Sequence, residues 1–103
     1  GIYSMSKKLD KSNFLISDVI EKPTVKEAPS NHAVIGRYIL PKKIFKILKD
    51  QGKGKGGEIH ITDAIKKMIY DGSTYVGHKF SGKYLDCGTM NGYIKSSEVI
   101  SKL

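Results

Sequence analysis

Cysteine, arginine and long apolar runs are nearly missing from this sequence, and the shortages narrow what it can be. Cys87 is the only cysteine among 103 residues, which excludes an internal disulfide and a zinc site built from several cysteines. No apolar stretch approaches the ~18 residues that span a bilayer. No secretory signal pattern is visible. We therefore expect a cytoplasmic protein with no membrane partner.

The shortage of arginine bears on the choice of partner. The net charge is +8, yet only Arg37 among the 18 basic residues is an arginine. Proteins that read base edges and phosphates depend on the flat guanidinium fork, which binds two acceptors at once. The lysine bias indicates solvated faces, and we expect no nucleic-acid partner. A small Lys-rich nucleic-acid-binding protein is the alternative interpretation, since a basic chain can also bind polyanions.

The order of apolar patterns predicts an α/β chain. After a polar edge strand and turn in residues 1–12, a strand is predicted over 14–20, with Phe14, Ile16 and Ile20 on one face. The next apolar run, 32–40, is nearly continuous, as in a strand covered on both faces. The remaining predictions are strands over 73–80 and 82–86 and helices from Pro41, from Glu58 to Gly72, and from Met90. One domain is expected, with a mixed sheet that is incomplete on its own because the 32–40 strand needs neighbours.

Two features look like ligand-binding motifs but lack the required context. The run Gly52–Gly57 follows a helix, and no Ser or Thr follows its lysines, so a mobile connector is favoured over a phosphate loop. His32, His60 and His78 have no metal-ligand spacing.

Two other places combine a charged side chain with the end of a predicted strand. Glu21-Lys22-Pro23 follows the first strand, and a carboxylate beside an ammonium suits a ligand with both hydroxyls and phosphate. Successive strand side chains face opposite ways, so both reach one ligand only if the strand bends there. A plain turn is the favoured alternative. Asp86 precedes a predicted helix, where it either holds Mg²⁺ or caps that helix.

Three longer motifs occur together and in a recognisable order. They are VIEKPTVKEAPSNHAVIGRYIL (19–40), GKGGEIHITDAI (54–65) and GKYLDCGTMNGYIKS (82–96). With this order and spacing, residues 18–98 resemble the C-terminal portion of bacterial UTP–glucose-1-phosphate uridylyltransferases.

The resemblance implies a fold and a set of roles. The fold would be the C-terminal part of a Rossmann-like nucleotide-diphosphosugar transferase, with helices flanking a mixed sheet. The activity would be formation of UDP-glucose and pyrophosphate from UTP and glucose 1-phosphate with Mg²⁺. Glu21 would bind glucose hydroxyls, Lys22 the sugar phosphate and Asp86 the metal. Val34 would contact the sugar by its backbone, and Gly1 would also touch it.

The resemblance also implies what the chain lacks. Neither the glycine-rich nucleotide-binding loop of the family's N-terminal half nor its second metal-binding aspartate is present in these residues. We therefore expect the chain to be a single sugar-phosphate-binding unit that is inactive alone. Its open sheet edge predicts a homo-oligomer. A transferase for another base, such as a thymidylyltransferase, is the alternative within the class. Glu58 and Asp63 would organise the second helix and the wall of the site.

Overall fold

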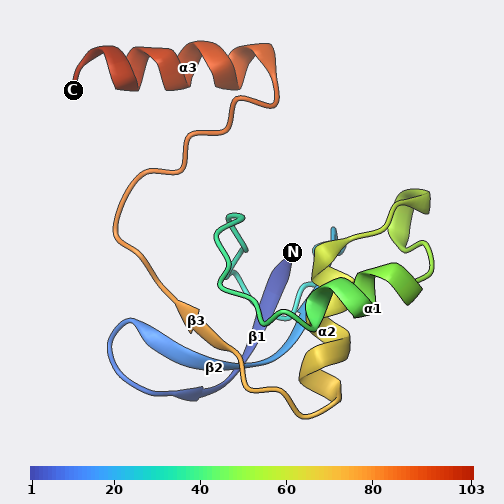
Figure 1. Ribbon diagram of the computed structural model, residues 1–103. Helices are drawn as coiled ribbons and strands as arrows, with labels where there is room; N and C mark the ends of the chain where they lie inside the picture. The colour runs from blue at the N-terminus through green and yellow to red at the C-terminus, as the bar shows by residue number, and fades with distance from the viewer.

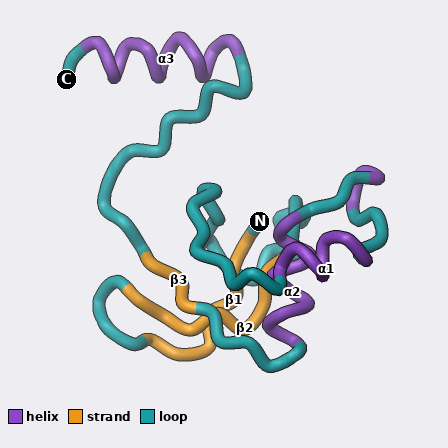
Figure 2. The backbone as a smooth tube through the Cα atoms, in the orientation of Figure 1, coloured by secondary structure: helices purple, strands orange, loops and turns teal.

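The computed structural model describes residues 1–103 and arranges them as a three-stranded sheet with helices beside it (Figure 1). In chain order the elements are β1 (Ile2–Lys8), β2 (Asn13–Ile20), α1 (Ile44–Asp50), the 3-10 turn η1 (Lys55–Gly57), α2 (Ile61–Tyr70), β3 (Val76–His78) and α3 (Met90–Ser101). Long loops join them (Figure 2). No helix has the length and apolar character needed to cross a membrane. The predicted α/β class is confirmed, and every strand pair within the chain is antiparallel.

β2 is the central strand, with β1 and β3 on its two sides. The pairing of β1 with β2 is irregular, because Ser4 pairs with Asp18 whereas the next residue, Met5, pairs with Ile16. The extra residue in β2 is a bulge, which reverses the facing of the side chains beyond it. Val19 is therefore buried in place of Ile20, and the predicted face is wrong in its last member.

The core lies between β2 and the first two helices. Its buried members are Val19, Ile44, Ala64, Ile65 and Met68. α2 packs against β2, and α1 packs against α2. This arrangement confirms the apolar stripe that predicted α2, because burying such a stripe is what stabilises a short helix.

The ends of α2 differ in how well the sequence predicted them. Gly72 follows the helix with φ +99°, a left-handed conformation that glycine adopts readily, and its N–H donates to the Ile69 carbonyl at 3.1 Å. The predicted stop is confirmed. The predicted start at Glu58 is wrong by three residues, because Glu58 and His60 have extended backbones and the helix begins at Ile61.

Three strand predictions need correction. The strand over 73–80 is reduced to β3, where Gly77 packs so closely on the Phe14 ring that no side chain fits. The predictions over 32–40 and 82–86 are wrong, since neither is a strand apart from a single bridge between Ala33 and Ile2. Strand residues need partners for their backbone groups, and no neighbouring strand supplies them here.

Residues 80–103, which we call the arm, extend away from the rest of the molecule (Figure 1). α3 lies at the end of the arm and packs against no other helix or strand. Its N-terminus is nevertheless capped, because the Thr89 hydroxyl accepts a hydrogen bond from the Gly92 N–H at 3.0 Å. The predicted terminal helix is confirmed, although it stands apart from the core.

Candidate functional site

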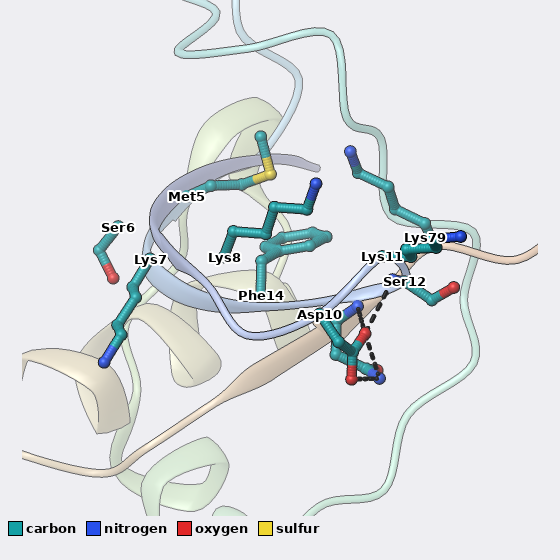
Figure 3. Close-up of a pocket in the computed structure, with 10 residues that line it drawn as sticks. Met5, Ser6, Lys7, Lys8, Asp10, Lys11, Ser12, Phe14 and Lys79 are labelled. Carbon is teal, nitrogen blue, oxygen red and sulfur yellow. Dashed lines mark hydrogen bonds between the residues drawn. The ribbon is translucent and has the colours of Figure 1, made fainter.

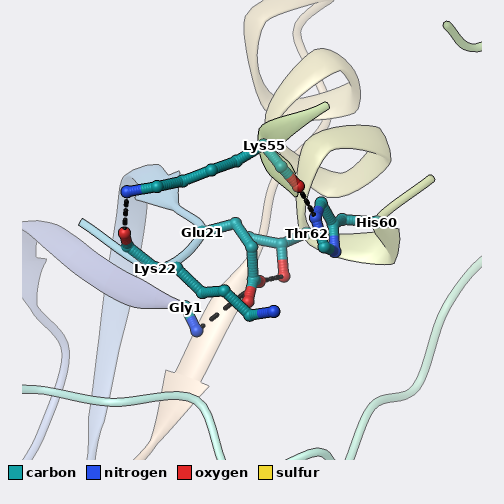
Figure 4. A network of polar contacts seen from close by, with 6 residues as sticks. All are labelled: Gly1, Glu21, Lys22, Lys55, His60 and Thr62. Carbon is teal, nitrogen blue, oxygen red and sulfur yellow. Dashed lines mark hydrogen bonds and ion pairs between the residues drawn. The ribbon is translucent and has the colours of Figure 1, made fainter. Parts of the chain in front are cut away.

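A network of polar contacts surrounds Glu21, the first residue after β2 (Figure 4). Its carboxylate accepts a hydrogen bond of 2.5 Å from the Thr62 hydroxyl, which lies in the first turn of α2. The Gly1 nitrogen lies 3.6 Å from the same carboxylate oxygen. Only 16% of the Glu21 side chain is exposed. The end of β2 and the start of α2 therefore hold this carboxylate in a fixed place.

The surroundings of Glu21 favour its charged form. The Thr62 hydrogen bond is the largest influence and lowers the pKa of the carboxyl below its ordinary value of 4.5, while partial burial acts in the opposite direction. The nearby Gly1 nitrogen and His60 ring act on the pKa in the same direction as Thr62, to a smaller extent. Glu21 is thus an ionised hydrogen-bond acceptor at neutral pH.

A substitution at Thr62 tests how its hydroxyl affects the Glu21 carboxylate. Because the pKa of Glu21 is lowered on folding, its contribution to stability is present above about pH 4.5 and is lost as the pH falls through the folded value. Thr62→Val keeps the shape and removes the donor. We expect a loss of about 1–2 kcal/mol in the free energy of unfolding at pH 7 and a smaller further loss on acidification.

Urea unfolding of both proteins between pH 3 and pH 7 measures this difference. Thr74→Val, at an exposed threonine, is the control. Parallel pH curves for wild type and Thr62→Val would show that the hydroxyl does not tune Glu21.

The backbone bends at Lys22. A bend at this point is what allows the side chains of Glu21 and Lys22 to reach the same ligand. Lys22 has φ +46°, the only positive φ at a residue other than glycine. This left-handed conformation costs a residue with a side chain about 1–2 kcal/mol, and such strain gathers at functional sites. The exposed Lys22 side chain runs on the same side of the turn as the Glu21 carboxylate (Figure 4), without an ion pair between them.

The connector between α1 and α2 holds this bend. The Lys55 ammonium donates a hydrogen bond to the Lys22 carbonyl (Figure 4). The Lys55 carbonyl is in turn hydrogen-bonded to His60 Nε2 at 2.8 Å. The glycine-rich run is thus a connector tied to the Glu21–Lys22 turn rather than a phosphate loop. The Asp63 carboxylate packs against Gly54, where a Cβ atom would otherwise lie.

Gly1 and Val34 complete the surroundings of Glu21. The Val34 N–H donates to the Gly1 carbonyl at 2.8 Å. A methyl group on Gly1 would lie 3.1 Å from the Thr62 Cγ2 atom and 3.3 Å from Val34 Cγ2, so this corner is tightly packed. Tyr38 also lies near Glu21. Burial and, to a smaller extent, the charge of Glu21 raise the pKa of the Tyr38 hydroxyl. Four of the five predicted site residues therefore lie together.

Asp86 is the predicted residue that the structure does not join to this cluster. It is exposed in the arm, and no hydrogen bond or ion pair links it to Glu21 or Lys22. Its Oδ1 atom accepts from the Gly88 N–H at 2.8 Å. Since Thr89 caps α3, the interpretation of Asp86 as that helix's cap is wrong. Its carboxylate keeps a second oxygen free for another ligand.

Three members of the site could not be found from the sequence patterns. Thr62, Lys55 and Tyr38 are separated from Glu21 by 17 or more positions in the chain, and only folding brings them near it. The one available signal was the position of Thr62 beside Asp63 at the start of a strongly patterned helix.

A hollow of about 220 Å³, separate from the Glu21 turn, lies beside the β1–β2 hairpin and gathers lysine side chains (Figure 3). Its lysines are Lys7, Lys8, Lys11 and Lys79. The one aromatic residue that lines it, Phe14, is only 4% exposed. The Lys79 ammonium lies 5.8 Å from the centroid of the Phe14 ring. This hollow therefore offers no aromatic face on which a single-stranded base could stack.

Comparison with known proteins identifies relatives over most of the chain. A family model described as nucleotidyl transferase matches residues 5–102. A UTP–glucose-1-phosphate uridylyltransferase of Pseudomonas aeruginosa is 49% identical over 82 residues, which is 80% of this chain and 29% of that protein. A protein of the same description from Mycoplasma pneumoniae is 42% identical over 80% of the chain and 28% of its own length. The chain thus spans about three tenths of the curated relatives it matches.

Solved structures with descriptions of the same kind also match nearly the whole chain. UDP-glucose pyrophosphorylase complexed with UDP-glucose matches 98% of the chain with a TM-score of 0.90 and 40% identity, and the match covers 38% of that structure. A UTP-bound UGPase from Acinetobacter baumannii matches 97% of the chain at a TM-score of 0.76 and 35% identity, covering 33% of that structure. The match to the first of these structures covers 98% of the chain and therefore extends into the arm.

Proposed function

The chain belongs to the nucleotidyl transferase family, and from that premise we propose that it supplies the sugar-phosphate side of an enzyme that makes UDP-glucose and pyrophosphate from UTP and glucose 1-phosphate. The observation that carries the proposal is the ionised Glu21 beside the strained turn at Lys22. The uridylyltransferases that match at 39–49% identity over about four fifths of the chain support the choice of reaction.

Glu21 is suited to bind the hexose. A carboxylate accepts hydrogen bonds from two vicinal hydroxyls, and one that is already ionised and held by Thr62 loses little freedom on binding. Gly1 and Val34 lie in the same corner, where the hydrogen bond from the Val34 N–H to the Gly1 carbonyl fixes their backbones next to the carboxylate. In this proposal the three residues together orient glucose 1-phosphate.

Lys22 is suited to the phosphate. Its ammonium is exposed beside the Glu21 carboxylate and is free to neutralise an oxyanion. In the reaction a phosphate oxygen of glucose 1-phosphate attacks the α-phosphorus of UTP, the bond to the β-phosphate breaks, and pyrophosphate leaves. Catalysis of this kind consists mostly of positioning and charge neutralisation. Lys22 would supply both, with Lys55 holding the turn that aims it.

The residues present fit Mg²⁺ in part. No group of three His, Cys, Asp or Glu side chains gathers to hold a metal. Mg²⁺ in phosphate chemistry takes one or two carboxylates together with substrate oxygens, so one free carboxylate oxygen on Asp86 agrees with a site completed elsewhere. When bound, the ion would neutralise charge on the phosphates. Asp86 would present its carboxylate to the ion, with the Gly88 N–H fixing its direction.

A chimera tests the proposed function. The chain replaces the matching segment of the Pseudomonas aeruginosa relative, and product formation is measured with UTP and with dTTP against glucose 1-phosphate. We expect UDP-glucose from the chimera, a strong preference for UTP, and no turnover by the 103-residue chain alone. A folded chimera without activity, or a preference for dTTP, would overturn the assignment. Normal turnover by the chain alone would overturn its restriction to one side of the reaction.

A cytoplasmic location and a homo-oligomer also belong to this proposal. The single cysteine supports the location, because it fits a reducing compartment. The open edges of the sheet support self-association.

A further inference from the structure

Four lysines line the hollow beside the β1–β2 hairpin, and no acid neutralises them. Lys7 and Lys8 belong to β1, Lys11 to the hairpin turn, and Lys79 follows β3. The structure contains three ion pairs, and none of these four ammonium groups takes part in them. Unpaired positive charges gathered around a concave surface produce a local field that attracts anions.

Asp10, the one acid of the hollow, is committed to the hairpin turn. Its Oδ1 atom accepts hydrogen bonds from the Ser12 and Asn13 N–H groups, each at 2.8 Å, and the Asn13 side-chain amide donates to both carboxylate oxygens. These bonds lower the pKa of Asp10, with the Asn13 side chain as the largest cause. Asp10 therefore shapes the turn, and its single negative charge leaves the lysines in excess.

Hydrogen bonds fix the walls of the hollow. The Lys79 N–H donates to the Ser12 carbonyl at 2.7 Å, which ties the end of β3 to the hairpin turn. The Leu9 N–H donates to the Asn13 carbonyl at 2.9 Å and closes the turn itself. His78 Nδ1 is hydrogen-bonded to the Asn13 side chain at 2.8 Å. The lysine backbones are thus already in place, and a ligand has to order only their side chains.

Two of the lysine side chains converge. In Figure 3 Lys8 and Lys79 extend toward one another beside the Phe14 ring, whereas Lys7 points away from them. A cation–π contact with Phe14 holds the Lys79 ammonium near this ring. Lys8 and Lys79 are therefore placed to act on one anion, and Lys7 provides a matched control on the same strand.

The lining limits the kind of anion that fits. Met5 and Phe14 are its only apolar residues, and Phe14 is buried, so the hollow lacks the apolar anchors of a protein interface. The lack of an exposed aromatic ring disfavours single-stranded nucleic acid. The volume of about 220 Å³ is below the roughly 300–1,000 Å³ of pockets for drug-sized molecules. A compact anion satisfies all three limits.

We propose that this hollow binds an oligophosphate, an anion with two or more linked phosphate groups, through Lys8, Lys11 and Lys79. An ammonium binds phosphate as a point charge and needs no flat guanidinium fork, in keeping with the lysine bias of the chain. One phosphate monoester carries about 1.5–2 negative charges at neutral pH, so linked phosphates balance three lysines better than a single one. The proposal is independent of the proposed function, because the hollow is separate from the Glu21 turn.

Titration of the chain with inorganic tripolyphosphate tests the site. Calorimetry measures the affinity, and amide chemical shifts locate the anion. We expect a Kd of about 10⁻⁴ M at low salt, with the largest shifts in residues 7–12 and at Lys79. Binding should weaken at least about tenfold at roughly 0.5 M NaCl, because salt screens exposed charges. Shifts that avoid the hairpin, or no measurable binding, would overturn the site.

A nucleoside triphosphate carries the same linked phosphates and is the second arm of the titration. ATP is expected to bind within about threefold of tripolyphosphate, because nothing in the hollow is placed to stack a base. Binding of ATP more than about tenfold tighter would show recognition of the nucleoside and overturn a site built for the phosphates alone.

Substitutions assign the binding to particular lysines. Lys8→Gln and Lys79→Gln should each weaken tripolyphosphate binding about fivefold, while Lys7→Gln should stay within about twofold of wild type. All three side chains are exposed, so the fold should tolerate each change. Equal losses in the three variants, or no loss in any, would reveal general attraction to a chain of charge +8 and overturn the site.

Lys22→Gln separates this site from the proposed function. Lys22 lies at the Glu21 turn and outside the hollow, so its replacement should leave tripolyphosphate binding unchanged. Loss of binding in Lys22→Gln, with Lys8→Gln unaffected, would place the anion at the Glu21 turn and overturn the hollow while sparing the proposed function. A folded chimera that makes no UDP-glucose, with tripolyphosphate binding intact and sensitive to Lys8→Gln, would support the hollow and overturn the proposed function.

Discussion

Replacing Glu21 by alanine in the chimera is expected to lower kcat/KM for glucose 1-phosphate by about 10²-fold or more. The carboxylate is ionised and aimed by Thr62, so a bound hexose gains hydrogen bonds to a charged acceptor. Such bonds contribute about 1.5–3 kcal/mol each, and two of them account for the expected loss. Initial rates at varied glucose 1-phosphate and fixed UTP measure the effect.

The controls separate binding from folding. Glu21→Gln retains an oxygen that accepts from Thr62, so we expect the thermal midpoint to change little while the KM for glucose 1-phosphate rises. The KM for UTP should stay the same. Glu27→Ala, at an exposed loop position, should leave the rates unchanged. If Glu21→Ala raised both KM values equally or only lowered stability, the residue would be structural.

Replacing Asp86 by asparagine is expected to lower kcat by about 10²- to 10³-fold. The amide oxygen can still accept from the Gly88 N–H, so the local turn survives while the charge is lost. A carboxylate that holds Mg²⁺ contributes several kcal/mol through the charge that the ion neutralises. Rates measured over a range of Mg²⁺ concentrations should show a higher requirement for the ion in the variant.

Asp50→Asn is the matched control for this change, because Asp50 is an exposed aspartate at the end of α1. It should retain full activity and an unchanged Mg²⁺ requirement. An Asp86→Asn chimera within twofold of the parent, with the same Mg²⁺ dependence, would remove Asp86 from the metal site.

The sequence predicted elements whose stability is local. β2, α2 and the stop at Gly72 depend on nearby residues and on one apolar face, and all are found. The strand predicted over 32–40 failed because a strand needs neighbours, and the pattern of residues cannot say whether neighbours are present. The prediction that Ile20 faces the core failed for a related reason. Val19 is buried instead because of the bulge, and the bulge depends on how β1 pairs with β2.

The candidate site divides in the same way. The charged turn at Glu21 and Lys22 was visible because its residue types are unusual at the end of a strand, and the family resemblance gave it a role. Thr62 and Lys55 were invisible, because they reach the turn only through the packing of α2 and its connector. The left-handed backbone at Lys22 is likewise a property of the folded chain, held by that connector.

The separateness of the arm has a consequence for control of the chemistry. The distance between the carboxylates of Asp86 and Glu21 is not fixed by any contact within these residues. The arm can therefore place Asp86 at different distances from the Glu21 turn, and the two carboxylates can act on one ligand only when contacts outside these residues hold the arm in place.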